Sequence, residues 1–208
     1  MSRGRMQRRF AIKKVAVCAL LAGAALGFSA CSPGKASFHA TDITGADYAK
    51  DFQLVDFDGK PRSLADFKGK VVVVFFGYTH CPDVCPTTMS ELAQVKQALG
   101  ADGDKLQVLF VSVDPERDTP TVLKAYMQPF DPSFLALYAA TPDKLVALAK
   151  DFKVFYQKVP RKDSADYSVD HTAASYVYDA QGRLRLFVRY GTPLQDWTDD
   201  IKQLLGGA

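Results

Sequence analysis

Residues 71–86 read VVVVFFGYTHCPDVCP, and the architecture of the chain follows from them. Val71 to Phe76 form an unbroken run of β-branched and aromatic side chains that is too short for a helix. Such a run indicates a strand buried on both faces of a sheet. A loop with two cysteines follows, and Pro86 suits the first turn of a helix that we expect to end near Leu99. The pattern therefore predicts a strand, a cysteine loop and a helix in succession.

The chain on both sides of this segment alternates between strands and helices. Apolar runs predict the strands, and amphipathic segments that begin at a proline predict the helices. The expected strands are 52–57, 61–64, 106–113, 134–138, 173–178 and 184–189, and the expected helices are 120–128, 141–152 and 193–205. The first two strands and the last two form hairpins. This order predicts an α/β sandwich around a mixed sheet.

Composition places the body of the chain among ordinary globular proteins. The 208 residues are 48% hydrophobic and 24% charged, which excludes a disordered chain. Lys and Arg number 26 against 23 Asp and Glu, but six of the basic residues and none of the acidic ones precede residue 31. A slightly acidic body without a polybasic stripe lacks the charge that nucleic-acid binding requires. We therefore expect no nucleic-acid partner.

The first thirty residues have the features of a secretory signal. A basic stretch precedes residues 15–30, VAVCALLAGAALGFSA, which are apolar, rich in small side chains and short for a membrane span. Phe28-Ser29-Ala30-Cys31 resembles a bacterial lipobox, which predicts lipidation of Cys31. An uncleaved membrane anchor is the alternative. Either places the body outside the cytoplasmic membrane, in an oxidising compartment.

These features divide the chain into three parts. Residues 1–30 are predicted to be a signal peptide of the lipoprotein type, and residues 31–50 a small, polar tether without helical or strand periodicity. Residues 51–208 are predicted to be the folded domain. We expect a monomer in the bacterial cell envelope that faces the periplasm and is anchored by its lipid at the inner membrane.

Cys81 and Cys85 are the cysteine pair that remains in the mature body. A structural disulfide is disfavoured, because a five-residue ring contributes roughly 2 kcal/mol and a domain of this size has enough core without it. The pair lies between a buried strand and a helix start, where open α/β sheets bind ligands. Because the helix dipole favours an anion, we expect Cys85, at the helix start, to be a thiolate.

Two thiolates four residues apart can converge on one soft metal ion, such as Cu(I) or Zn. A zinc site requires four ligands, and the mature body has no second cysteine pair. His171 stands directly before a predicted strand, far along the chain, and its imidazole would complete a set of two sulfurs and one nitrogen. A solvated or core position is the alternative for this histidine. His80, which adjoins Cys81, is the other nearby nitrogen donor.

Three motifs follow one another in the chain. They are Gly77-Tyr78-Thr79-x-Cys81-Pro82-Asp83-Val84-Cys85-Pro86, then residues 111–120, VSVDPERDTP, and then Asp170-His171-Thr172 before a strand. Together they resemble the Sco (SenC) family of copper-binding, thioredoxin-like proteins over residues 50–205. The second motif has a modest physical meaning, because it reads as a strand end, a turn and a capped helix start. We expect a structural role for it, with a partner-facing loop as the alternative.

The resemblance implies a thioredoxin-like three-layer sandwich with a mixed central sheet and an added N-terminal β-hairpin. It also implies that Cys81, Cys85 and His171 hold copper as Cu(I) or Cu(II). A family member of this kind would help to load the dinuclear copper centre of cytochrome c oxidase subunit II, or another respiratory copper protein. It would be anchored to the membrane by an N-terminal lipid or span.

A periplasmic thiol-disulfide oxidoreductase without an obligatory metal is the alternative function. It would use Cys81 and Cys85 as its redox pair. Ordinary thioredoxins place two residues between the cysteines, often after a tryptophan, whereas three stand here and Trp197 is the single tryptophan. Thioredoxins also carry a proline beside the active disulfide, and none occurs between Arg161 and Tyr178. The sequence therefore favours a metallochaperone, and leaves thiol reductase activity open as an addition.

Overall fold

The computed structural model describes residues 37–162 and 166–208, and its folded unit is Ser37–Ala208. The predicted signal peptide, the predicted lipidation site Cys31 and the start of the predicted tether lie outside the described residues. The strand expected at 71–76 is β4 (Val71–Gly77), and all seven of its residues are buried. β5 (Leu106–Ser112) runs parallel beside it in continuous register, so that both strands end at the same edge of the sheet.

Eight strands form the central sheet in the order β1-β10-β9-β4-β5-β6-β2-β3. Strands β4, β5 and β6 are parallel to one another, and the remaining pairings are antiparallel. The other six strands are β1 (Thr41–Asp42), β2 (Leu54–Asp56), β3 (Pro61–Arg62), β6 (Leu135–Tyr138), β9 (Ala174–Tyr178) and β10 (Leu184–Arg189). The mixed sheet is therefore confirmed, and β2 and β3 are the added N-terminal hairpin at its edge.

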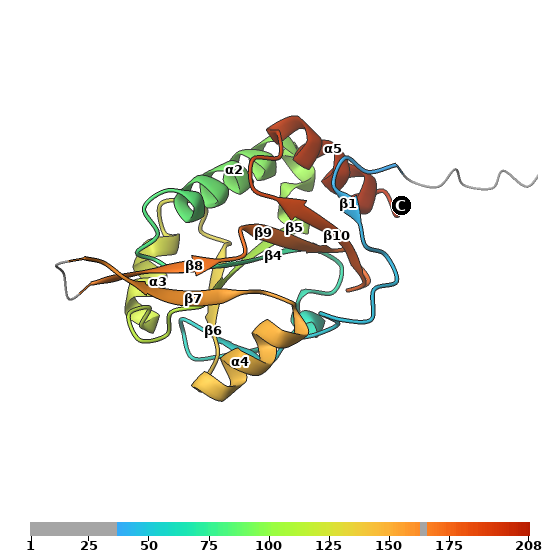
Figure 1. Ribbon diagram of the computed structural model, residues 1–208. Helices are drawn as coiled ribbons and strands as arrows, with labels where there is room; N and C mark the ends of the chain where they lie inside the picture. The colour runs from blue at the N-terminus through green and yellow to red at the C-terminus, as the bar shows by residue number, and fades with distance from the viewer. Residues whose placement is uncertain (1–36, 163–165) are drawn as a thin grey trace, which may run out of the picture. The chain divides into compact units, whose positions relative to one another are not determined.

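Helices cover both faces of this sheet (Figure 1). The α-helices are α2 (Val84–Ala98), α3 (Pro120–Met127), α4 (Pro142–Asp151) and α5 (Leu194–Leu205), and the short 3-10 helices are η1 (Leu64–Phe67) and η2 (Gly100–Lys105). α2 and α5 pack together on one face, α4 lies on the opposite side, and α3 packs beside β6. No helix in residues 37–162 and 166–208 is long and apolar enough to cross a membrane. The layers confirm the three-layer α/β sandwich.

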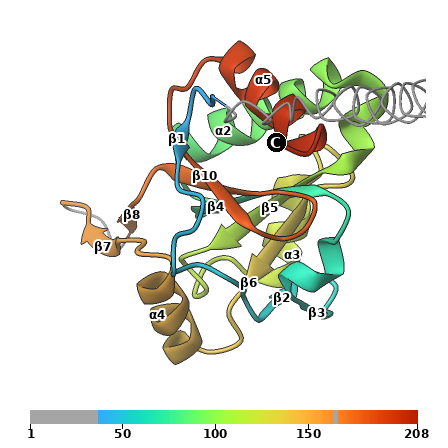
Figure 2. The same cartoon turned by 90° about the vertical axis from the view of Figure 1, so that its right-hand side faces the viewer.

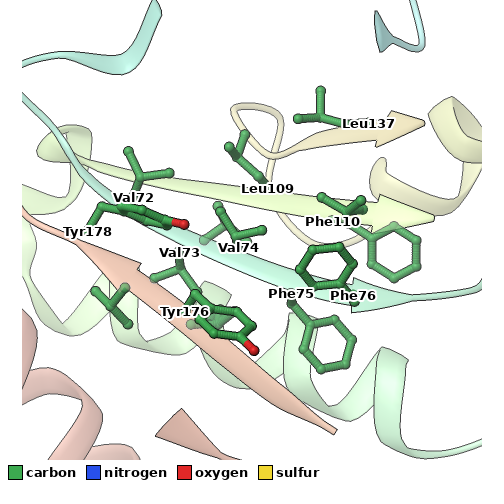
Figure 3. Close-up of a cluster of buried hydrophobic side chains, with 14 of the residues drawn as sticks. Val72, Val73, Val74, Phe75, Phe76, Leu109, Phe110, Leu137, Tyr176 and Tyr178 are labelled. Carbon is green, nitrogen blue, oxygen red and sulfur yellow. The ribbon is translucent and has the colours of Figure 1, made fainter. Parts of the chain in front are cut away.

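The core is made of branched and aromatic side chains from adjacent strands (Figure 3). Phe76 of β4 packs edge to face against Tyr176 of β9, with ring centroids 6.3 Å apart. Phe152, which caps the C-terminus of α4, lies 5.1 Å from the Phe76 ring and 5.4 Å from the Tyr176 ring. Edge-to-face pairs of this kind stabilise a core beyond the apolar area that they bury. The core therefore gives the loops at the strand ends a rigid support.

Residues 37–50 belong to the folded unit, so the prediction that they form a tether is wrong. The carboxylate of Asp200 in α5 is buried and accepts hydrogen bonds from the backbone N–H groups of His39, at 2.9 Å, and Ala40, at 2.8 Å. β1 then pairs with β10 at the edge of the sheet. Because these partners lie up to 161 residues away, local periodicity could not indicate them.

A second, two-stranded sheet was not predicted. It consists of β7 (Tyr156–Pro160) and β8 (Tyr167–His171), which pair antiparallel with Tyr156 opposite His171. β7 is exposed along most of its length, so it lacks the alternation that marks a strand. Figure 2 shows this hairpin projecting from one side of the body. His171 is therefore the last residue of β8, and two residues separate it from β9, where the predicted strand 173–178 left one.

Candidate metal centre

The two cysteines lie where β4 gives way to α2. Cys81 is half-buried in the loop, whereas Cys85 is fully buried in the first turn of α2. Both are free thiols. The backbone N–H of Cys85 donates to Sγ of Cys81 at 3.4 Å, and this N–H is one of those at a helix start that lack a partner within the helix. The start of α2 therefore orients the Cys81 sulfur.

Gly77, the last residue of β4, makes room for the Cys85 sulfur. A Cβ atom at this position would lie 2.9 Å from Sγ of Cys85 and 2.8 Å from the ring of Phe110. Carbon and sulfur atoms do not approach that closely in real structures. The absence of a side chain at residue 77 thus lets the sulfur sit directly against the end of the strand.

His171 reaches the cysteines from the other end of the domain sequence. Its Nε2 lies 3.5 Å from Sγ of Cys85, and its Nδ1 lies 3.2 Å from the carbonyl oxygen of Thr172. A carbonyl oxygen accepts a hydrogen bond, so Nδ1 is the donor and Nε2 turns its lone pair toward the sulfurs. The rings of Phe75 and Tyr78 contact the imidazole edge to face, at 6.0 and 5.9 Å between centroids. Packing and a hydrogen bond together fix its orientation.

The three predicted donors meet in one cluster. Sγ of Cys81, Sγ of Cys85 and Nε2 of His171 all lie within 4.8 Å of one another. Donors around one ion with metal–sulfur bonds near 2.3 Å lie about 4 Å apart, so small movements would close the cluster on a metal. Two sulfurs and one imidazole nitrogen suit a soft ion such as copper. The residues present can therefore hold copper.

The two thiols differ in acidity, and in the opposite sense to the prediction. A hydrogen bond from the Cys85 thiol, together with the backbone N–H groups of Asp83 and Cys85, lowers the pKa of Cys81 to about 3 although burial opposes it. The same hydrogen bond, together with burial, raises the pKa of Cys85. The expectation that the helix dipole makes Cys85 the thiolate is wrong, because Cys85 is buried against the strand end and Cys81 receives the N–H group of the helix start.

His80 does not join the cluster. Its side chain is exposed, and its Nδ1 lies 3.1 Å from the hydroxyl of Thr79. Within the described part of the chain, one group of three or more His, Cys, Asp or Glu side chains can hold a metal, and it contains His171 instead.

A known protein family matches the domain that carries this cluster. The family model described as SCO1/SenC matches residues 40–206, nearly the whole described domain. The chain belongs to the SCO1/SenC family. A mouse relative, "Protein SCO2 homolog, mitochondrial", is 39% identical over 142 residues, which is 67% of this chain and 54% of that protein. The Sco chain thus spans about half the length of the curated mitochondrial relatives that it matches.

Solved Sco structures share the fold. The structure of copper-bound ScoI from Bradyrhizobium japonicum is 42% identical, with a TM-score of 0.67, and covers 74% of this chain and 98% of that one. BsSco is 24% identical with a TM-score of 0.60, covering 80% of this chain and 97% of its own, and shows likeness of fold. BsSco is described as a member of the Sco family of cytochrome c oxidase assembly proteins.

The motif at residues 111–120 also supports the centre of this Sco protein, in a way that the sequence did not reveal. Thr119 caps α3, as predicted. Asp118, however, is buried beneath the cysteine loop, and its carboxylate accepts hydrogen bonds from the hydroxyls of Thr79 and Ser112, both at 2.6 Å. Both of its oxygens also lie 3.2 Å from the backbone nitrogen of Thr79. Burial raises the pKa of Asp118, and these hydrogen bonds oppose the rise.

Proposed function

We propose that this Sco protein is a copper chaperone that binds copper through Cys81, Cys85 and His171. Its recipient is the dinuclear copper centre of cytochrome c oxidase subunit II or another respiratory copper protein. The convergence of two sulfurs and one imidazole nitrogen within 4.8 Å, from segments 86 residues apart, is the observation that carries this proposal. Membership of a family described as oxidase assembly proteins supports the recipient.

The donor set suits a cargo that must be held and then released. Two thiolates satisfy Cu(I), and the nitrogen of His171 adds the donor that Cu(II) prefers. Cys85 is buried, whereas Cys81 and His171 are partly exposed. An incoming ligand from a recipient can therefore replace Cys81 or His171 while Cys85 still holds the ion. Transfer by stepwise ligand exchange follows from this difference in exposure.

The sequence supports a position outside the cytoplasmic membrane. Residues 1–30 have the pattern of a lipoprotein signal, and Cys31 is the residue that would carry the lipid. A lipid-anchored domain that faces the periplasm at the inner membrane would lie on the side of the membrane where the proposed recipient exposes its copper centre. We include this anchor in the proposal.

Thiol-disulfide exchange is a second candidate, favoured by the unequal thiols. Cys81 is partly exposed and its pKa is lowered to about 3, so it is the nucleophile. Its thiolate would attack a disulfide of the recipient and release one recipient thiolate. Cys85 would then lose its proton and attack Cys81 in the mixed disulfide, releasing the second thiolate. The pair would lose two electrons and the recipient would gain them, which would prepare its cysteines for metal.

A set of four variants tests the chaperone. Reduced wild type is expected to bind one Cu(I) per chain, and Cys81→Ser and Cys85→Ser to lose this binding and oxidase assembly in cells together. His171→Ala is expected to retain Cu(I) on two thiolates but to lose the thiolate-to-Cu(II) charge-transfer absorption. His80→Ala is the matched control, because it removes a neighbouring imidazole outside the cluster.

Two results would contradict the proposal. The first is an unchanged Cu(II) spectrum in His171→Ala together with a loss of the charge-transfer absorption in His80→Ala. This result would show that His80, and not His171, supplies the nitrogen ligand. A wild-type protein that supports oxidase assembly and reduces a disulfide, yet never holds stoichiometric copper, would leave the reductase as the function.

A further inference from the structure

The hairpin of β7 and β8 carries His171 but is not part of the central sheet. Its two strands pair with each other, so the main-sheet hydrogen bonds that fix β4 and the cysteine loop do not fix β8. A donor atom must be held within a fraction of an ångström to complete a metal site. Contacts between the hairpin and the body must therefore set the position of His171.

Arg117 makes several contacts to β8 and to the residue that precedes it. Its Nη1 donates to the carbonyl oxygen of Tyr167 at 2.9 Å and to the carboxylate of Asp166 at 2.8 Å. Its guanidinium also stacks on the Tyr167 ring, with 3.6 Å between its central carbon and the ring centroid. Its Nε donates to Asp114 at 2.6 Å, and the hydroxyl of Tyr167 donates to the same carboxylate at 2.7 Å. These contacts close a ring.

This ring is sheltered from solvent. The side chain of Asp114 is fully buried, and that of Arg117 is 17% exposed. An arginine that is partly buried, stacks on an aromatic ring and donates to three separate acceptors is a stronger and more directional link than a surface ion pair. The loop between β5 and α3 carries both residues. Through them it holds Tyr167, the first residue of β8, by hydrogen bonds and ring stacking.

The position of Tyr167 determines the position of His171, because both residues belong to the short strand β8. Alternate residues of a strand point to the same face, so Tyr167, Val169 and His171 share one face of β8. Val169, which lies between them in the strand, is buried in the core. Fixing Tyr167 at one end of this short strand therefore fixes the imidazole at the other.

The residue next to Arg117 holds the opposite half of the site. Asp118 accepts the hydroxyl hydrogen bond of Thr79, which stands two residues before Cys81. Two adjacent residues thus connect to the two halves of the donor set: Asp118 to the cysteine loop and Arg117 to the histidine strand. Arg117 and Asp118 are adjacent in the chain. The β5–α3 loop therefore positions the cysteine loop and β8 relative to each other.

We propose that Arg117 is a positioning residue of the metal centre, which acts through Tyr167 to place Nε2 of His171 at the cysteine pair. This rests on the proposed copper site. Loss of Arg117 removes the imidazole from the donor set but leaves both thiolates in place. Lysine does not replace arginine here, because an ammonium group has neither the planar fork nor the stacking face that this ring uses.

The chain contains a matched control for the link itself. Lys158 of β7 and Glu116 form an ion pair of 2.5 Å between the same hairpin and the same loop. Both side chains are exposed, at 45% and 68%, so solvent screens the pair and it contributes little. Glu116→Gln removes this bridge but keeps Lys158, whose Nζ lies 4.8 Å from the centroid of the Tyr167 ring, and it leaves every contact between Arg117 and Tyr167 in place.

The test compares wild type, Arg117→Met, Arg117→Lys, Glu116→Gln and His171→Ala as whole folded proteins. Each is loaded with Cu(I) and oxidised, and the Cu(I) stoichiometry, Cu(II) affinity and thiolate-to-Cu(II) absorption are measured. Both Arg117 variants are expected to keep one Cu(I) per chain, to lose about tenfold or more in Cu(II) affinity, and to acquire the spectrum of His171→Ala. Glu116→Gln is expected to match wild type.

A double variant separates positioning from general damage to the fold. If Arg117 acts through His171, adding Arg117→Met to His171→Ala causes no further loss of Cu(II) affinity. Additive losses, or a wild-type spectrum in both single Arg117 variants, would overturn the inference. If Arg117→Met is insoluble, the same double-mutant cycle is measured with Arg117→Lys and His171→Ala. A His171→Ala protein indistinguishable from wild type would instead refute the proposed site, and this inference with it.

Discussion

Gly77 and Cys85 approach so closely that a Cβ atom on the glycine would lie 2.9 Å from the cysteine sulfur. We predict that Gly77→Ala displaces this sulfur, lowers the free energy of unfolding by about 1–3 kcal/mol and weakens Cu(I) binding. Denaturant unfolding of the reduced protein and competition with a Cu(I) chelator measure both effects.

Gly206→Ala is the matched control for this substitution. Gly206 ends α5 with a right-handed backbone, at φ −76°, and the nearest atom to its Cβ would be 3.4 Å away. Gly206→Ala should change neither the free energy of unfolding nor the affinity for Cu(I). A wild-type copper affinity in Gly77→Ala would show that copper binding does not depend on the close approach of the Cys85 sulfur to residue 77.

The thiols of the metal-free, reduced protein should react unequally with iodoacetamide. Because the pKa of Cys81 is lowered to about 3, its thiolate predominates at every pH well above that value, and its alkylation rate should be nearly flat between about pH 5 and 8. Cys85, whose pKa is raised, should stay unmodified. Mass spectrometry of the native protein locates the label.

The cause of the lowered pKa can be tested separately. Cys85→Ala removes the thiol that donates to the Cys81 sulfur, so the pKa of Cys81 should rise toward its ordinary value and alkylation should become pH-dependent. Cys85→Ser retains a donor and should show a smaller rise. A wild-type profile with its midpoint near that of a free cysteine would contradict this assignment.

Oxidation of the cysteine pair should block copper loading. Thiolates bind the metal, and a disulfide between Cys81 and Cys85 removes both of them. The reduced protein should take up one Cu(I) per chain, and the oxidised protein almost none until a reductant is added. Equal uptake by the two forms would eliminate the two-thiolate site.

The buried carboxylate of Asp200 should matter for stability and not for metal binding. Asp200→Ala leaves the N–H groups of His39 and Ala40 without their acceptor, so we expect a loss of about 1–3 kcal/mol in the free energy of unfolding. Copper stoichiometry should be unchanged. Asp199→Ala, at the preceding position, serves as the control and should fall within about 0.5 kcal/mol of wild type.

The predicted anchor is tested by removing it. A chain without residues 1–31 should bind copper normally in solution, because the folded unit begins at Ser37. When exported on a cleavable signal at native levels, it should restore oxidase activity poorly, since it is no longer held near the membrane. Full restoration would show that the anchor is dispensable.

The sequence predicted the parts of this structure that depend on local pattern. The apolar run of β4, the proline-led helices and the turn between β9 and β10 each carry their own signal, so their positions agree closely with the structure. Cys81, Cys85 and His171 were identified because soft donors are rare and their types suggest a common ligand. Family resemblance then placed them in one site.

The parts that were missed depend on contacts across the fold. β7 has an exposed, charged sequence whose pairing with β8 is supported from outside by Arg117, 50 residues away from its partner Tyr167. Residues 37–50 are held by Asp200 from the far end of the chain. The predicted order of acidity of the two cysteines was wrong, because the hydrogen bond to Cys81 and burial together raise the pKa of Cys85 in spite of its position at a helix start. None of these partners can be identified from neighbouring residues.

The hairpin of β7 and β8 makes its ladder outside the eight-stranded sheet. The proposed ligand set is consequently divided between two cysteines, which follow the end of a core strand, and one histidine on a separate hairpin. Replacing His171 with a thioether or a carboxylate would change the metal selectivity and would remove the ring contacts with Phe75 and Tyr78, but it would leave Gly77 and the space that it provides for the Cys85 sulfur unchanged. For protein engineering, this domain offers a site with two thiolate ligands in which the third ligand can be substituted separately.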